Sequence, residues 1–367
     1  MFDITQADKH LKVSPTVEGR DLVFYDVRQA DVDFYGLYEP RGEAPFRRMP
    51  LDVAKTVSKD VYSLSQHTSG GRIRFKTDSK TIAIHAIQRK KTRYFSHMTF
   101  LGPAGFDLYR IENGEQVFVK ALMPPIHREE GYSAVADLRG EGMYEYVLHF
   151  PLYDWVTELY LGLEPGARLE KGTPYTASQK PVVFYGSSIT QGGCASRPGL
   201  NYCPMVSRWL DADFTCLGFS GSCLAEPEMA QYLASLEASA FVLAYDGNAP
   251  DPAYLRATYE PLFQTIRRAQ PETPIILTSN YFLGALITTE EDQATCDERW
   301  EIIKETYDRA VASGDKKVWF VDAKGVFAEF GGNDCTVDGC HSNDLGFYLM
   351  AKSLAPSLRE ALGLENK

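Results

Sequence analysis

The sequence predicts two domains of different architecture: an all-β sandwich or jelly roll, followed by an α/β domain in which helices cover both faces of a parallel sheet. Hydrophobic residues follow a period of two through residues 12–163. From residue 181, short apolar strands alternate with helical stretches. A stretch rich in Pro, Gly and polar residues, 164–180, separates the two patterns. The 367 residues suffice for roughly two or three domains.

The N-terminal pattern is typical of strands with one buried face. An early strand begins at Val23, and further strands are expected over 117–119 and 144–150, between turns that contain glycine. The alternating positions on either side of a turn at 77–80 are Ile73, Phe75, Ile82, Ile84 and Ala86. No long helix is expected here. Short strands at this spacing favour a β-sandwich or jelly roll.

The polar stretch 164–180 predicts the domain boundary. We therefore expect an N-terminal β domain over residues 1–170 and a catalytic α/β domain over 171–367.

The C-terminal half alternates strand and helix throughout. Strands are expected over 182–185, 214–217, 241–245, 275–278 and 318–321. Helices are expected around 202–210, 227–237, 252–269, 292–312 and 344–362. Such alternation predicts a parallel sheet with helices on both faces, whose functional site lies beyond the carboxyl ends of the strands.

Composition excludes several classes of function. The formal net charge of −11 disfavours a general nucleic-acid or membrane-surface binder, and no apolar run reaches the ~18 residues of a membrane helix. Residues 1–9 show no basic segment followed by an apolar one, so we expect a cytoplasmic protein, with secretion or a periplasmic location as the alternative. The sequence leaves the oligomeric state open.

The seven cysteines all lie in the second half, and their number is odd. No CxxC motif or Cys/His metal spacing occurs, and Gly192-Gly193 matches no nucleotide-binding motif, so we expect neither a metal nor a cofactor. Free thiols are the expectation, and a disulfide between Cys335 and Cys340 is the alternative.

Polar segments that carry chemistry follow four of the expected strands. They are residues 186–193, 218–222, 246–250 and 338–346. A serine needs a positioned base to act as a nucleophile, and His341 is the only one of seven histidines in this half. Asp338 can turn back across Gly339 and accept the other ring N–H of His341. Alternatively, Asp338 only forms the turn, and a backbone carbonyl orients the imidazole.

These segments resemble a known family. Gly-Ser-Ser-Ile-Thr, Gly-Phe-Ser-Gly, Asp-Gly-Asn-Ala-Pro and Asp-Gly-Cys-His are similar, in order and spacing, to the four blocks of the SGNH (GDSL-like) hydrolases over residues 181–362. The resemblance implies a three-layer α/β/α, flavodoxin-like sheet. It implies Ser188 as nucleophile, His341 as general base and Asp338 as its orienter. It also implies an oxyanion hole formed by the N–H groups of Ser188 and Gly221 and the side-chain amide of Asn248.

Two features set the chain apart within that resemblance. Ser187 replaces the Asp of the Gly-Asp-Ser block, and we assign it no role. Gly105-Phe-Asp-Leu-Tyr109 resembles the Gly-x-Asp-Leu-Tyr signature of the β domain that precedes such hydrolases, an architecture similar to that of carbohydrate acetyl esterases. We expect Asp107 and Tyr109 to be structural. For Gly221 a plain turn glycine, and for Asn248 a helix cap, are the alternatives.

The expected function is therefore a serine esterase that removes acetyl groups from a carbohydrate through an acyl-enzyme. Its partner is a small acylated substrate, an acetylated sugar or oligosaccharide, and neither nucleic acid nor membrane. The alternatives are a lipase or thioesterase on the same triad, and a carbohydrate-binding protein with a decayed site. The β domain is expected to help shape the substrate cleft, because the connection between the halves is short.

Overall fold

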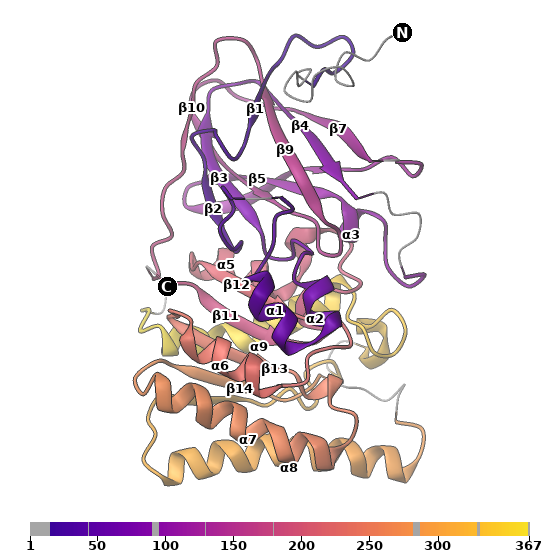
Figure 1. The fold of residues 1–367 in the computed structure, drawn as a ribbon, viewed down its shortest axis with the longest axis vertical. Coiled ribbons are helices and arrows are strands. Elements are labelled where there is room, and N and C mark those ends of the chain that lie inside the picture. Colours follow the sequence, from indigo (N-terminus) through magenta and orange to yellow (C-terminus); the bar gives the residue numbers. More distant parts are fainter. Residues whose placement is uncertain are drawn as a thin grey trace.

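The computed structural model describes residues 15–42, 44–89, 95–128, 130–178, 180–281, 287–328 and 331–365. Residues 1–9, on which the expectation about location depends, lie outside them. Figure 1 shows the antiparallel sheets at one end of the long axis and helices α7 (Pro252–Ala269) and α8 (Glu290–Ala312) at the other. Among the described residues, no helix is long and apolar enough to cross a membrane.

The N-terminal part is a sandwich of two antiparallel sheets, as the sequence predicts. One sheet has the order β1 (Val23–Asp26), β9 (Val156–Leu163), β4 (Thr81–Gln88) and β7 (Gly131–Asp137). The other has the order β10 (Leu169–Lys171), β3 (Arg72–Thr77), β8 (Tyr144–His149), β5 (Phe106–Glu112) and β6 (Glu115–Leu122), with β2 (Asp33–Tyr35) also paired to β3.

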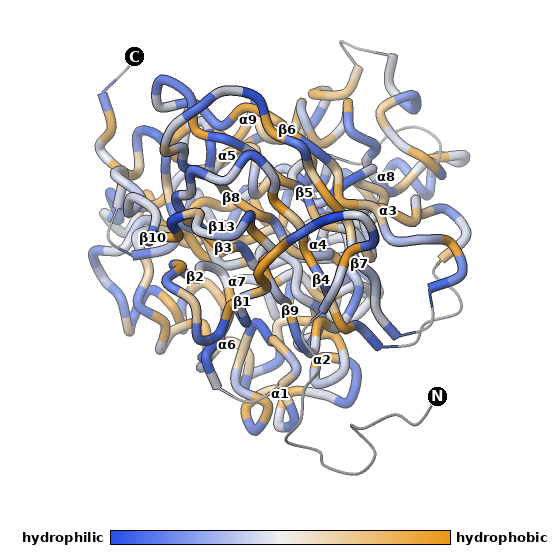
Figure 2. Tube along the Cα trace, turned by 90° about the horizontal axis from the view of Figure 1, so that it is seen from above, coloured by the Kyte–Doolittle hydropathy of each residue, from blue (hydrophilic) through white to orange (hydrophobic). Residues whose placement is uncertain are grey.

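Strands β3 and β4 follow one another in the chain but belong to different sheets. Their alternating apolar side chains, such as Phe75 and Ile84, meet in one buried cluster between the sheets. The turn at 77–80 therefore passes the chain from one layer to the other. Figure 2, which looks at the molecule from above, shows hydrophilic stretches at many places around the outline and hydrophobic stretches among the strand labels.

The C-terminal part is a five-stranded parallel sheet between two layers of helices, and this too agrees with the prediction. The strand order is β12 (Phe214–Gly218), β11 (Val182–Gly186), β13 (Ala240–Ala244), β14 (Ile275–Thr278) and β15 (Val318–Val321). All its strand pairs are parallel. The chain leaves the interior strand β11 for the edge strand β12 and then returns to the other side of β11. This reversal of strand order is where α/β sheets place their sites.

Alternate residues of β11 supply the two cores. Val183 and Tyr185 pack in the cluster with α6 (Pro227–Ser235), α7 and α8, whereas Val182 and Phe184 pack in the cluster with α5 (Tyr202–Leu210) and α9 (Asp344–Ala361). Because successive side chains of a strand point to opposite faces, a run of apolar residues predicts a strand buried on both sides.

The short helices within the N-terminal half, which include α3 (Leu101–Ala104), were not predicted. Helices α1 (Leu51–Val57) and α2 (Lys59–Leu64) contribute Ala54 and Val61 to the core cluster of the α/β part, and α1 packs against α6. Neither is long enough to show a helical period in the sequence. The segment thus supplements the core of the α/β part.

A buried arginine joins the two parts. Arg48 is 2% exposed, and its guanidinium donates to the carbonyl oxygens of His67, Leu64, Cys216 and Gly218. Two of these acceptors lie in or next to α2, and the other two lie in β12. The arginine therefore fixes the end of β12, one of the strands that border the site.

The Gly-x-Asp-Leu-Tyr signature forms a second connection. Asp107 is fully buried and accepts hydrogen bonds from Arg197 (2.9 Å) and from the backbone N–H of Gly199 (2.8 Å), while Arg197 also donates to the hydroxyl of Tyr109 (2.6 Å). A Cβ at Gly199 would lie 2.5 Å from the hydroxyl oxygen of Tyr109, so only glycine fits there. The motif fastens the sandwich to the loop that precedes α5.

Candidate active site

The predicted nucleophile lies on a tight turn between β11 and the four-residue helix α4 (Ser188–Gln191). The Ser187 hydroxyl caps this helix by accepting a hydrogen bond from Ile189 N–H at 3.2 Å. A Cβ at Gly186 would lie 2.0 Å from Thr190 Oγ1, and one at Gly218 would lie 2.2 Å from Gln191 N. Glycines at the ends of β11 and β12 therefore let α4 lie close against the sheet.

The loop before α9 presents His341. The same Asp338 oxygen accepts from the backbone N–H groups of Cys340 (3.0 Å) and His341 (2.7 Å). Gly339, which follows Asp338, has a φ of +84°. The other Asp338 oxygen lies 2.8 Å from His341 Nδ1. Partial burial alone would raise the pKa of Asp338, but these hydrogen bonds outweigh it and lower the pKa to about 2. Asp338 therefore forms the turn and contacts the imidazole at once.

The structure brings Ser188, His341 and Asp338 together. Ser188 Oγ lies 2.9 Å from His341 Nε2, and Ser188 is 8% exposed. An ionised Asp338 accepting from Nδ1–H leaves Nε2 with a lone pair directed at the serine hydroxyl. This geometry allows the imidazole to remove the hydroxyl proton during attack on an ester carbonyl.

The three groups predicted for the oxyanion hole line the same pocket. In the described part of the chain, the N–H groups of Ser188 and Gly221 donate to no protein acceptor. Gly221 has a φ of +69°, which favours glycine, and open space where a Cβ would be. Asn248 Oδ1 is buried and has no hydrogen-bond partner among the described residues.

Arg299 of α8 holds the turn that carries Asn248. Its guanidinium donates to the carbonyl oxygen of Asp246 (2.6 Å) and to that of Ala249 (2.9 Å), the two ends of a 3₁₀ turn over Asp246–Asn248. No sequence motif pointed to this arginine, because its partners are main-chain atoms about 50 positions away.

The pocket above Ser188 has a volume of about 320 Å³. Three of its lining residues, Phe95, His97 and Met98, come from the N-terminal half. The ring of His97 stacks on that of His341, with centroids 4.9 Å apart and an angle of 23° between the planes. Sequence reasoning missed His97, because nothing in its neighbourhood in the chain marks it as a neighbour of residue 341.

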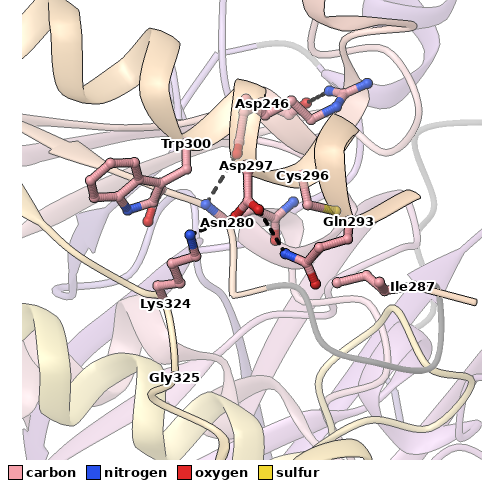
Figure 3. Close-up of a pocket in the computed structure, with 11 residues that line it drawn as sticks. Asp246, Asn280, Ile287, Gln293, Cys296, Asp297, Trp300, Lys324 and Gly325 are labelled. Carbon is pink, nitrogen blue, oxygen red and sulfur yellow. Dashed lines mark hydrogen bonds and ion pairs between the residues drawn. The ribbon is translucent and has the colours of Figure 1, made fainter. Parts of the chain in front are cut away.

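A second pocket of about 450 Å³ lies on the other side of the Asp246 turn (Figure 3). Its lining includes Trp300 and an ion pair of 2.6 Å between Lys324 and Asp297. Among the described residues that line it, no serine forms a hydrogen bond with a histidine, so we place the chemistry in the smaller pocket.

All seven cysteines are free thiols, including Cys335 and Cys340. The alternative of a disulfide between these two is therefore wrong.

Comparison with known protein families finds a match for each half of the chain. The GDSL-like lipase/acylhydrolase family matches residues 179–359, and the N-terminal domain of SGNH-hydrolase-type esterases, named for its GxDLY motif, matches residues 22–169. No curated protein matches closely enough to count as a relative.

Solved structures resemble the whole chain. A GDSL-like lipase from Bacteroides ovatus has a TM-score of 0.85 and 28% identity over 95% of this chain and 100% of its own. The salicylyl-acyltransferase SsfX3 from a tetracycline biosynthetic pathway has a TM-score of 0.76 and 22% identity over 94% of this chain and 99% of its own. The acetyl xylan esterase Est2A from Butyrivibrio proteoclasticus has a TM-score of 0.57 and 15% identity over 94% and 99%. The chain is thus a member of the GDSL-like (SGNH) hydrolase family, with the β-sandwich domain of the GxDLY type at its N-terminus.

Proposed function

We propose that this protein is a serine esterase that removes small acyl groups, chiefly acetyl groups, from a carbohydrate. The observation that carries the proposal is the hydrogen-bonded series from Asp338 through His341 to Ser188 at the wall of an open pocket. Membership of a hydrolase family and an esterase among the similar structures support the reaction class.

The proposed reaction has two halves. Ser188 Oγ attacks the ester carbonyl carbon while its proton passes to His341 Nε2, and the oxyanion accepts hydrogen bonds from the Ser188 and Gly221 N–H groups and the Asn248 amide. The C–O bond to the sugar then breaks, and the sugar oxygen takes the proton from His341. In the second half, His341 removes a proton from water, which attacks the carbonyl carbon of the acyl-serine. The bond from that carbon to Ser188 Oγ then breaks, Oγ takes the proton back from His341, and the carboxylic acid leaves.

The dimensions of the pocket favour a small acyl group. About 320 Å³ is at the lower end of the volumes of small-molecule sites. Phe95 at its rim is 58% exposed, and an exposed ring beside a polar site suits the apolar face of a sugar. Because this residue comes from the N-terminal half, the proposal includes a substrate cleft shared by both halves.

A chain-length series tests the proposal. We expect kcat/KM on 4-nitrophenyl esters to be highest for acetate and at least ~10-fold lower for octanoate. Release of acetate from acetylated xylo-oligosaccharides, compared with a peracetylated monosaccharide, then tests the carbohydrate part. Higher activity on long chains would favour the lipase or thioesterase alternative. Binding of oligosaccharide without turnover of any ester would favour the decayed, carbohydrate-binding alternative.

A further inference from the structure

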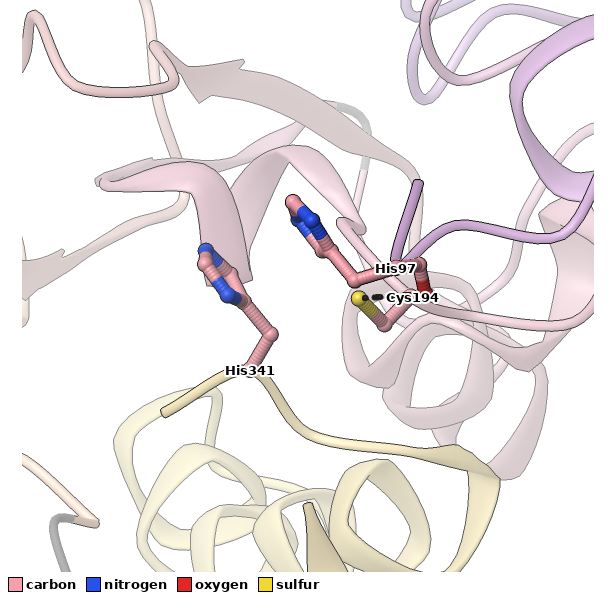
Figure 4. Close-up of side chains that lie close together, drawn as sticks. All are labelled: His97, Cys194 and His341. Atoms are coloured by element: carbon pink, nitrogen blue, oxygen red, sulfur yellow. Dashed lines mark hydrogen bonds between the residues drawn. The ribbon is translucent and has the colours of Figure 1, made fainter. Parts of the chain in front are cut away.

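Three side chains that can bind metal converge beside the candidate nucleophile. One nitrogen each of His97 and His341 and the sulfur of Cys194 all lie within 4.8 Å of one another (Figure 4). The three residues come from the N-terminal half, from the loop after α4 and from the loop before α9. Spacing along the chain indicates no metal site, because only the folded chain brings these residues together.

Each residue has a nitrogen or sulfur atom that can bind a metal ion. His97 stacks on its neighbours, but its ring makes no hydrogen bond within the described residues. His341 Nδ1 is held by the Asp338 carboxylate, so Nε2, which lies 2.9 Å from Ser188 Oγ, is the nitrogen that a metal ion would take. This carboxylate–imidazole arrangement is the one that supports metal-binding histidines.

Cys194 is held in position by an unusual backbone. Its φ is +73°. Its thiol donates a weak hydrogen bond of 3.5 Å to the carbonyl oxygen of His97. The side chain is 5% exposed and is not part of the pocket lining. The thiol is therefore buried beside the two imidazoles.

We propose that His97, Cys194 and His341 form an inhibitory site for a thiophilic divalent cation, and that this cation is zinc. Binding releases the thiol proton to solvent and engages the lone pair of His341 Nε2. The imidazole then cannot accept the proton of Ser188, so ester hydrolysis stops until the ion leaves. The inhibitory consequence rests on the proposed function, whereas the binding itself does not.

The adjustment that zinc requires is small. Bonds of about 2.0–2.3 Å in a tetrahedron place ligand atoms ~3.5 Å apart, so the donors must approach by about 1 Å. Imidazole lone pairs lie in the ring plane, so His97 must also turn out of its stack on His341. Water or Ser188 Oγ, 2.9 Å from Nε2, can take the fourth position.

Chemistry and charge select the ion. Two imidazoles and a thiolate match zinc, whereas magnesium and calcium prefer oxygen ligands. The ionised carboxylate of Asp338 beside the cluster favours a cation over an anion. The open pocket provides a path from solvent.

Calorimetry on the full chain with zinc chloride is the first test. We expect one ion per chain, binding at least ~10-fold weaker for Cys194→Ser, and no comparable heat from magnesium. With cobalt(II), the wild type should show a thiolate-to-cobalt charge-transfer absorption that Cys194→Ser lacks. Ser188→Ala should still bind zinc, so these measurements stand even if the protein is not an esterase.

Inhibition kinetics are the second test. Zinc should inhibit ester hydrolysis, a chelator should restore it, and Cys194→Ser, with unchanged activity before zinc is added, should need at least ~10-fold more zinc. Cys340→Ser is the matched control, because this thiol lines the same pocket but is not in the cluster, and its zinc sensitivity should equal that of the wild type. Zinc binding that is unaffected by Cys194→Ser, or is lost in Cys340→Ser, would overturn the proposal.

Discussion

The hydroxyl of Tyr153 donates a hydrogen bond of 3.1 Å to the main-chain carbonyl oxygen of Ser188. Tyr153 lies between β8 and β9 of the sandwich and is 2% exposed. At the other end of α4, the Gln191 amide donates to Leu152 O (3.2 Å) and accepts from Ser220 N–H (3.0 Å). The sandwich thus supports both the nucleophile turn and the loop of Gly221, which gives a physical reason for both domains to be present.

Tyr153→Phe should weaken this support without removing it. Ser188 O also accepts from Gly193 N–H at 2.8 Å, so its carbonyl is not left unpaired. We expect a loss of ~1 kcal/mol in the free energy of unfolding and a fall in kcat of less than ~10-fold. Urea denaturation and ester kinetics measure the two effects. A fall of more than 100-fold in kcat at unchanged stability would contradict a purely supporting role.

Ser188→Ala should abolish ester hydrolysis, with kcat reduced at least ~10⁴-fold. The side chain is small, so folding should be unaffected. Ser187→Ala is the matched control, because its hydroxyl caps the four-residue helix but does not contact His341. We expect ~1 kcal/mol lower stability and retained turnover for the control. Turnover that persists in Ser188→Ala and disappears in Ser187→Ala would reverse the assignment.

Asp338→Asn should reduce kcat by ~10³–10⁴-fold, because an amide does not hold the imidazole in the required tautomer or stabilise its charge.

The Asp338→Asn variant should also lose stability at neutral pH. The folded pKa of about 2 lies below the unfolded 3.8, so the stabilisation is present above pH 4 and is lost as pH falls through about 2. Urea midpoints from pH 6 down to pH 3 should therefore converge for wild type and variant. A constant difference across that range would contradict this contribution.

The sequence predicted the helices, strands and site residues that are specified by residues close to them in the chain. The helix expected over 252–269 has these bounds, because Asp251 caps its start and Pro252 follows at its first position. Strand β11 was found because it is apolar on both faces, and Asp338 because it lies only three residues from the histidine that it contacts.

What the sequence did not reveal depends on contacts between distant segments. Helix α1 packs on α6 and α2 packs on α1, and both are too short to show a period in the sequence. His97 contacts His341 only because the folded N-terminal half contributes residues to the pocket above Ser188. Arg299 binds main-chain carbonyls, which leave no trace in the sequence of their own loop.

Arg299→Met should lower kcat by roughly 10-fold or more and change KM little, because the turn that presents Asn248 loses both of its hydrogen bonds to α8. Asn248→Ala should cost ~10²–10³-fold in kcat, as for other oxyanion donors. If Arg299 acts by positioning Asn248, its substitution should have little further effect in the Asn248→Ala background. Arg256→Met, on the exposed side of the same region and paired with Glu305, is the control and should match the wild type. Additive losses in the double variant would argue against the positioning role.

Asp246 should make stability depend on pH near neutrality. The carboxyl is 3% exposed, and burial raises its pKa to about 7 although Arg299 acts in the opposite direction. Its folded pKa lies above the unfolded 3.8, so the native state binds the proton more tightly, and this stabilisation decreases as pH rises through about 7.

Asp246→Asn keeps an acceptor for the Asn280 N–H, which lies 3.0 Å from the carboxylate in the wild type, but does not titrate. The free energy of unfolding of the variant relative to wild type should therefore rise by up to ~1.4 kcal/mol for each pH unit from pH 5 to about pH 7, and level off above that. Urea midpoints at one-unit intervals measure this, and Asp308→Asn, at an exposed site on α8, should run parallel to the wild type. Parallel curves for Asp246→Asn as well would mean that this carboxyl stays ionised in the folded protein across the range.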